Sequence, residues 1–169
     1  MLYNISTPIN KKINGITIGD RVEISGIIYT ARDAVMPKLV EFINAERLEE
    51  LSVNLSGSAI MHTAFSPAGY GPTSSNKEEI ESTMGILSKA GVRFHLGKGE
   101  IKQNTIDEIS EFGSVFIVVP PASALLQNRL VSKRVVAFEE EGMEALHELI
   151  VNRLPGVVAA ANGMSIFNR

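Results

Sequence analysis

The chain has 169 residues, a length typical of one compact domain, and we expect residues 1–169 to form a single domain. Apolar residues make up 44% of it, which is enough for a hydrophobic core and too many for a disordered chain. The net charge is −3 with no dense lysine and arginine cluster, and no apolar stretch is long enough for a spanning helix. We therefore expect a cytoplasmic protein with neither a nucleic-acid nor a membrane partner.

The sequence contains no cysteine. A disulfide, a thiol nucleophile and a cysteine-ligated metal or iron–sulfur cluster are therefore excluded within this chain. Its three histidines, His62, His95 and His147, lack the short spacing of a zinc site, and lone histidines near apolar neighbours are usually structural. We expect no metal ligand here, so any metal in the chemistry must come from another chain.

The first half of the chain alternates β-rich segments with segments of helical period. Residues 21–30, RVEISGIIYT, are rich in Ile and Val and predict a strand. A helix should follow, with Asp33 as its N-cap and Pro37 in its first turn. Its apolar face has members at i, i+4, i+7 and i+8, namely Val35, Leu39, Phe42 and Ile43. Residues 58–66, SAIMHTAFS, predict the next strand.

The second half continues the alternation. A helix should begin at Ser75, which forms a capping box with Glu78, and a second box of Thr105 and Glu108 should start another. Residues 92–96 and 114–120 predict strands, the latter buried on both faces. Residues 142–151, GMEALHELIV, predict a helix. Strands alternating with helices indicate a mixed, layered α/β domain.

Three loops join a strand end to a helix start or a glycine turn: residues 30–33, residues 69–77 and residues 97–99. The middle loop combines the features of an anion site. Its glycines allow close backbone approach, and the following helix offers free N–H groups. Thr73, Ser74 and Ser75 add hydroxyl groups, and Lys77 adds a cation. The loop does not match the phosphate-binding pattern G-x-x-x-x-G-K-[ST].

Each loop also has an ordinary explanation. Arg32 could be a solvated side chain beside a helix cap, Lys98 could belong to a surface hairpin, and the middle loop could simply precede a capped helix. The combination favours a site, because Arg32, Lys77 and Lys98 all lie near strand ends, where α/β sheets gather their ligands. Together they suit a small molecule with two carboxylates, one of which an arginine can bind with two hydrogen bonds.

The motifs YTARDA, GPT-S, GKG and E-GMEAL, in this order, resemble the C-terminal domain or β subunit of class I fumarases and L-tartrate dehydratases. The resemblance extends from Gly19 to about Pro155. It implies a swivelling β/β/α domain that closes over a 4Fe–4S cluster held by cysteines of the N-terminal domain or α subunit. A cysteine-free chain fits a split-subunit member, so the expected partner is a cysteine-bearing α subunit that supplies the cluster.

The resemblance also implies roles for individual residues in a reversible addition or removal of water on a small dicarboxylic acid. Arg32 resembles the arginine that binds a substrate carboxylate, and Lys98 the lysine that contacts substrate. Thr73 resembles the threonine that exchanges a proton at the carbon next to the carboxylate. Asp33, Ser74 and Lys77 complete the expected substrate-binding set. Such a reaction passes through a carbanion-like state that cations stabilise, while a Lewis-acidic iron binds the hydroxyl group.

Three positions depart from the family pattern. Met36 stands where RDAAH has its histidine, Lys77 replaces an arginine and loses its two-pronged geometry, and Glu100 replaces a glycine. At the other end only Ala160-Ala161-Asn162-Gly163 resembles the usual D-x-x-G-N. The substrate is therefore left open among fumarate, malate, tartrate and other acids. The alternative function is a non-catalytic module that binds a small anion or another subunit and forms a homodimer when isolated.

Overall fold

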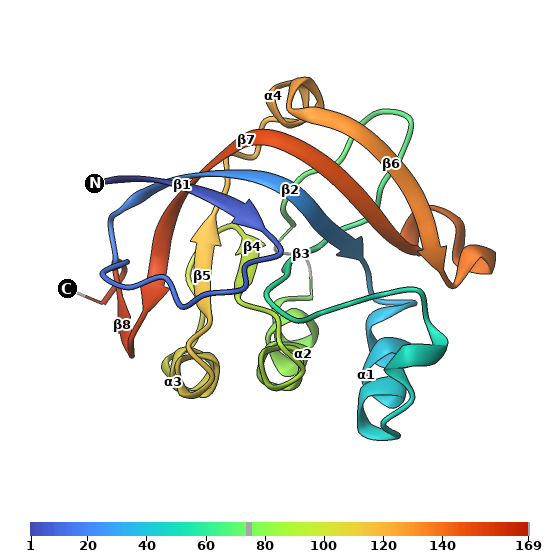
Figure 1. Ribbon diagram of the computed structural model, residues 1–169, viewed down its shortest axis with the longest axis horizontal. Helices are drawn as coiled ribbons and strands as arrows, with labels where there is room; N and C mark the ends of the chain where they lie inside the picture. The colour runs from blue at the N-terminus through green and yellow to red at the C-terminus, as the bar shows by residue number, and fades with distance from the viewer. Residues whose placement is uncertain (74–75, 169) are drawn as a thin grey trace.

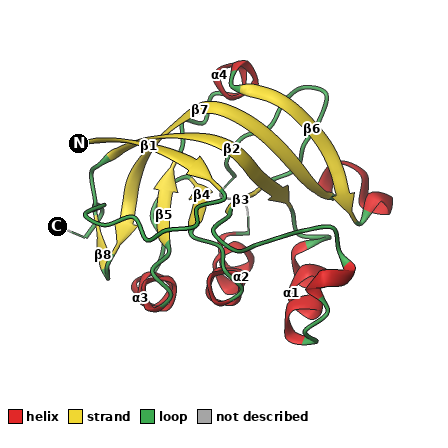
Figure 2. Ribbon diagram, in the orientation of Figure 1, coloured by secondary structure: helices red, strands yellow, loops and turns green. Residues whose placement is uncertain are grey.

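The computed structural model describes residues 1–73 and 76–168 and shows a mixed α/β fold (Figures 1 and 2). The strands are β1 (Leu2–Thr7), β2 (Arg21–Ala31), β3 (Ala59–His62), β4 (Phe94–Gly97), β5 (Val115–Val118), β6 (Leu130–Ala137), β7 (Leu146–Ala161) and β8 (Met164–Ser165). The helices are α1 (Met36–Asn44), α2 (Lys77–Lys89), α3 (Gln103–Glu111) and α4 (Ser123–Asn128), with 3-10 turns at η1 (Leu48–Glu50) and η2 (Glu139–Glu144).

The sheet closes on itself through strand β7. Strands β1 to β5 pair in parallel in chain order, and β7 then runs antiparallel to both β5 and β2. The pairings β2–β3–β4–β5–β7–β2 therefore form a ring, a small barrel-like sheet. Strand β7 has 16 residues, so it also reaches β6 along its first half. Helices α1, α2 and α3 connect the parallel strands and lie on one side of the sheet, below it in Figure 1.

The core lies inside the ring and between the ring and the helices. Residues inside the ring include Ile24, Ile28, Met61, Ile117 and Leu149, all fully buried. A second cluster joins β2 and β3 to α1 and α2, and a third joins α2 and α3 to β5 and β7. Strands β3, β4 and β5 are consequently buried on both faces, as strands covered by helices on one side and a core on the other must be.

Several expected elements are confirmed. Strands β3 and β5 form within the predicted segments, β2 and β4 each end one residue beyond theirs, and Leu39 is buried on the predicted face of α1. Gly91, at φ 120°, follows the end of α2. Strand β1 and the six-residue helix α4 were not predicted, because β1 is an edge strand with a mixed burial pattern and α4 is too short to show a period. No helix in the described ranges is long and apolar enough to cross a membrane.

The helix predicted for residues 142–151 is wrong. Residues 139–144 form the 3-10 turn η2, and strand β7 begins at Leu146. The apolar residues Leu146, Leu149 and Ile150 fall at i, i+3 and i+4, which is a helical spacing. Pairing decides for a strand, because this segment hydrogen bonds to β2 on one edge and to β6 on the other.

The predicted helix caps differ from the structure. Helix α1 begins at Met36 after Val35 and has no side-chain cap, so Asp33 is not its cap. Thr105 lies inside α3, where its hydroxyl donates to Glu81 Oε1 at 2.7 Å. Ser75 lies outside the described residues, and α2 begins at Lys77. Asp33 and Thr105 stand where the sequence predicts helix caps. In the structure, both bind side chains of other elements instead.

Candidate functional site

The three predicted loops meet at the carboxyl edge of the parallel strands. Arg32 and Asp33 follow β2, His62 ends β3, and Lys98 follows β4. Strands β2 and β3 pair in the register Ala31↔His62, and β3 and β4 pair through Met61↔Leu96. The ends of these three neighbouring strands therefore lie side by side, which is where open α/β sheets bind ligands.

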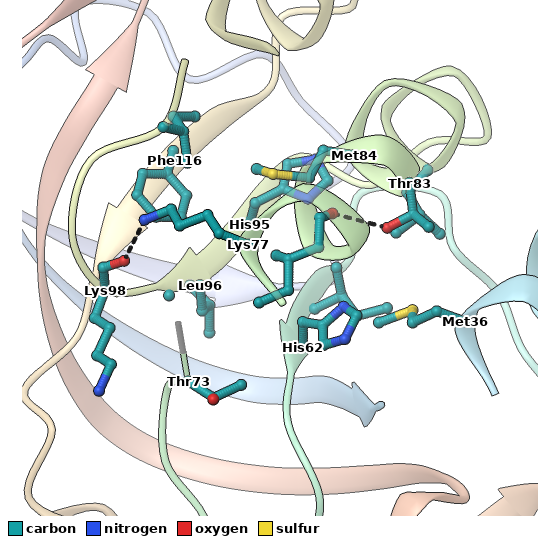
Figure 3. A pocket seen from close by; sticks show the side chains of 15 residues that line it. Met36, His62, Thr73, Lys77, Thr83, Met84, His95, Leu96, Lys98 and Phe116 are labelled. Carbon is teal, nitrogen blue, oxygen red and sulfur yellow. Dashed lines mark hydrogen bonds between the residues drawn. The ribbon is translucent and has the colours of Figure 1, made fainter. Parts of the chain in front are cut away.

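A small cavity lies at this edge, between β3, β4, α2 and the loop that precedes α2 (Figure 3). Thr73, Lys77 and Lys98 line it, so half of the six predicted site residues come together here. Its volume is about 30 Å³, which is room for a water molecule but not for a dicarboxylate. A substrate would therefore have to lie at its mouth or enter after the walls move.

Lys77 closes one side of the cavity. It is the first residue of α2, and its Nζ donates to the carbonyl oxygen of Lys98 at 3.1 Å (Figure 3). Burial lowers the pKa of Lys77, which the charges of Glu81 and Glu100 partly oppose. Gly99 has φ 73°, and a Cβ built there would lie 3.1 Å from the Lys77 amine. The glycine turn thus leaves the space that Lys77 occupies.

Asp33 binds two side chains at once. Its Oδ1 lies 2.7 Å from Nε2 of His62, and its Oδ2 accepts a hydrogen bond from Asn76 at 2.9 Å. Burial alone would raise the pKa of Asp33, but these hydrogen bonds and the nearby Arg32 charge lower it overall. Burial lowers the pKa of His62, against the opposing effect of Asp33. The pair is therefore a carboxylate beside a neutral imidazole at neutral pH.

The loop that carries Thr73 is tied down on both sides. Thr63, next to His62, donates to the carbonyl oxygen of Gly71 at 2.6 Å, and Asn76 binds Asp33. These two contacts hold Gly71 and Asn76 against the ends of β2 and β3. Thr73 lies between them and lines the cavity, while the predicted substrate ligand Ser74 lies outside the described residues.

The backbone of Arg32 is hydrogen bonded, whereas no described residue binds its side chain. Its N–H donates to the Glu144 carbonyl at 3.3 Å, and its own carbonyl accepts from the N–H groups of Val35 and Met36. The half-buried guanidinium forms no hydrogen bond or ion pair with any residue that the structure describes. Arg32 does not line the small cavity, but it is close enough for its charge to lower the pKa of both Asp33 and His62.

The sequence placed His62 among the structural histidines, yet in the fold it lines the cavity beside Met36. No local signal identified it, because His62 lies in the middle of the segment 58–66 predicted as a strand, whereas β3 ends at His62 in the structure. His95 is different, because it is fully buried, its Nε2 lies 2.7 Å from the Ser88 hydroxyl, and burial lowers its pKa to about 3. His95 therefore stays a neutral core residue.

No group of three or more His, Cys, Asp or Glu side chains that could hold a metal ion occurs within residues 1–73 and 76–168. The residues present therefore do not fit an iron–sulfur cluster. The cysteine-bearing partner expected to carry such a cluster stays a prediction.

Comparison with known proteins finds a family that matches almost the whole chain. The family model described as Fumarase C-terminus matches residues 3–169. A Methanocaldococcus jannaschii protein provisionally named L(+)-tartrate dehydratase subunit beta is 28% identical over 99% of this chain and 91% of its own length. The anaerobic class I fumarate hydratase of Escherichia coli is 29% identical over 83% of this chain. A Geobacillus stearothermophilus protein provisionally named class I fumarate hydratase is 32% identical over 69% of it.

The chain covers only part of the fumarate hydratases but nearly all of the tartrate dehydratase subunit. It spans 27% of the Escherichia coli enzyme and 23% of the Geobacillus stearothermophilus protein, but nearly all of the subunit from Methanocaldococcus jannaschii. The sequence motifs, the site at the carboxyl edge of the sheet and the match over residues 3–169 agree. The chain belongs to the fumarase C-terminal family.

Proposed function

We propose that this chain is the β subunit of an iron–sulfur-dependent hydro-lyase. The enzyme would reversibly add or remove water on a small dicarboxylic hydroxy acid of the fumarate/malate or tartrate type. One observation carries the proposal: Thr73, Lys77 and Lys98 line one cavity at the sheet edge from which Arg32 also emerges. The subunit-length match to the tartrate dehydratase relative supports a separate β subunit.

The arrangement suits the chemistry of this reaction. Loss of a proton from the carbon next to a carboxylate leaves negative charge on that carbon and on the carboxylate oxygens. Arg32 would bind one carboxylate with two hydrogen bonds, and Lys98 would add a second cation. Thr73 would exchange the proton. Lys77 would make one directed contact where an arginine would make two.

A partner must complete the site. The cavity is too small for the substrate and the described residues hold no metal group, so we infer that an α subunit supplies both the cluster and the facing wall. When bound there, the iron would act as a Lewis acid toward the substrate hydroxyl group. This chain would act as a swivelling domain that closes over the substrate with its carboxylate-binding cations.

Coexpression with a neighbouring gene product that carries three well-spaced cysteines tests the proposal. The two chains should copurify, and the anaerobically reconstituted assembly should interconvert a hydroxy dicarboxylate and its unsaturated partner in a panel of fumarate, malate and tartrate. This chain alone should be colourless and inactive. A stable homodimer that ignores the cysteine-bearing chain, or an assembly without turnover on the whole panel, would favour the non-catalytic module instead.

A further inference from the structure

His62 has one ring nitrogen that the described part of the chain leaves unused. The side chain is only 8% exposed, and its Nδ1 has no hydrogen-bond partner among the residues that the structure describes. Buried polar atoms are normally paired, because an unpaired one loses its hydrogen bond to water without replacement. An exception that lines a cavity beside Thr73 and Lys98 needs an explanation.

The other nitrogen defines the state of the ring. Asp33 Oδ1 lies 2.7 Å from His62 Nε2, and a carboxylate can only accept, so Nε2 must carry the proton. In the neutral ring Nδ1 then has a free lone pair and is the basic atom. His147 shows the contrast. It is 7% exposed, lies outside the cavity, and donates from Nδ1 to the Ala145 carbonyl at 2.9 Å.

The tertiary structure brings the threonine loop to this pair. Thr63, the residue after His62, holds Gly71, and Asn76 holds Asp33 through the oxygen that His62 does not use. Thr73 lies between these two contacts. These two contacts are therefore made with the His62–Asp33 pair itself or with the residue next to it.

We propose that His62, oriented by Asp33, is the proton acceptor of this cavity, and that its Nδ1 takes the hydroxyl proton of Thr73. The inference rests on the proposed hydro-lyase function. As the C–H bond next to a ligand carboxylate breaks, its proton bonds to Thr73 Oγ1. The former hydroxyl proton of Thr73 moves to Nδ1, and the electron pair stays on the substrate carbon. The imidazolium that forms is balanced by Asp33, and the reverse reaction returns both protons.

This assignment resolves a chemical difficulty. A threonine hydroxyl is a very weak base in water, whereas an imidazole held by a carboxylate is the usual activator of a hydroxyl group. Burial lowers the pKa of His62, which keeps its ring neutral and ready to accept. The charged and titratable groups near the ring come from several elements: Asp33, Arg32, Glu144, Glu79, Lys77, Lys98 and His95.

Nitrogen NMR of the isolated, histidine-labelled chain tests the link without requiring activity. At neutral pH, His62 should carry its proton on Nε2 and show an unprotonated Nδ1. Addition of malate to the isolated chain should shift the Nδ1 resonance of His62, as Thr73 moves onto it, and leave that of His147 in place. Thr73→Val should abolish this shift, and Thr73→Ser should restore it. A wild-type His62 resonance that does not shift, or that shifts equally in Thr73→Val, would overturn the proposal.

Kinetics of the two-subunit enzyme provide the second measurement. His62→Gln should lower kcat by about 10²- to 10⁴-fold with little change in KM, the usual range for loss of a proton-transfer group. The acid limb of the pH profile should disappear with it, and Asp33→Asn should give a smaller loss. The matched control is His147→Gln, which should keep wild-type kcat.

The two proposals fail in different ways. Equal kcat values for His62→Gln and His147→Gln in an active assembly would overturn the role of His62 and leave the hydro-lyase function standing. A wild-type assembly without any turnover would overturn the hydro-lyase function, while the ring-nitrogen result would still decide whether Thr73 and His62 are linked.

Discussion

The parallel strands have a cavity at each end, and the larger of the two has the weaker features of a binding site. The hollow at the amino ends of β3, β4 and β5 has a volume of about 670 Å³, against about 30 Å³ at the carboxyl ends. Yet Lys11 and Lys12 in the larger hollow are exposed, and the Arg93 guanidinium donates to the carbonyls of Ser88 and Val92. The charged groups of the larger hollow are therefore exposed to solvent or already hydrogen bonded.

The small cavity has the opposite character. It places Lys77, Lys98, a threonine and an imidazole with one nitrogen that no described residue binds around a space closed by apolar side chains. Charged groups act far more strongly in such surroundings than in water. The comparison teaches that the site is marked by one buried ring nitrogen, His62 Nδ1, without a partner among the described residues, rather than by the size of the opening.

The strongest test of this contrast exchanges one arginine at each end. Arg32→Ala should lower kcat/KM of the assembled enzyme by a factor worth about 2–4 kcal/mol of barrier, with little loss of stability, because no described residue binds its guanidinium. Arg93→Ala should do the reverse, lowering stability while keeping turnover, because Arg93 binds the end of α2. Steady-state kinetics and denaturant unfolding of both variants measure this. An unfolded Arg32→Ala, or one with normal turnover, would contradict the assignment.

Acid should destabilise the protein through its buried histidines. Burial lowers the pKa of His95 from 6.5 to about 3, so between these values the unfolded chain binds a proton that the native chain does not. Stability is therefore complete above about pH 6.5 and falls as the pH drops, by at most about 1.4 kcal/mol per pH unit for one group. His62 and His147, whose pKa values are also lowered, act in the same direction.

Denaturant unfolding between about pH 7 and pH 5 checks this, above the range in which carboxylates titrate. His95→Gln should give a shallower loss of unfolding free energy than the wild type. Parallel curves for the two proteins would mean that His95 takes up its proton in the native state.

Lys77 should tune which acid is accepted. Its amine lines the cavity and is held by the Lys98 carbonyl, so an arginine there would reach further and bind differently. Lys77→Arg should change the ratio of kcat/KM between fumarate and other dicarboxylates by about tenfold, or 1.4 kcal/mol. Lys77→Ala should weaken all substrates. The control is Lys12→Ala, at the amino ends of the strands, which should leave the substrate profile unchanged. If Lys77→Arg and Lys77→Ala also left the profile unchanged, Lys77 would not belong to the site.

Two glycines of like conformation provide the finest comparison. Gly99 has φ 73° and Gly113 has φ 71°, but an added Cβ meets Lys77 Nζ only at Gly99 and nothing within 4 Å at Gly113. Both alanine variants should lose about 1 kcal/mol of stability from the left-handed backbone. Only Gly99→Ala should also displace Lys77 and lower kcat/KM a few-fold. An equal effect of both variants on kcat/KM would show that the turn does not position Lys77.

Local sequence determined a large part of this protein. The segment that forms β5 is buried on both faces and the one that forms β2 is buried in its last residues, and the Ile- and Val-rich composition of both predicts strands. Glycine turns and the motifs YTARDA, GPT-S and GKG identified the loops at the strand ends and the family. Of the six predicted site residues, Thr73, Lys77 and Lys98 meet in one cavity, because consecutive parallel strands bring their carboxyl ends together.

Tertiary structure decided the rest. Residues 146–151 became a strand because β2 and β6 offered partners on both edges, and local propensity carries no information about those partners. Asp33 became the partner of His62 and Asn76, which are 29 and 43 residues away, instead of capping the adjacent helix. A carboxylate binds whichever donors the fold brings within reach, and only the closed sheet brings the ends of β2 and β3 and the threonine loop to one place.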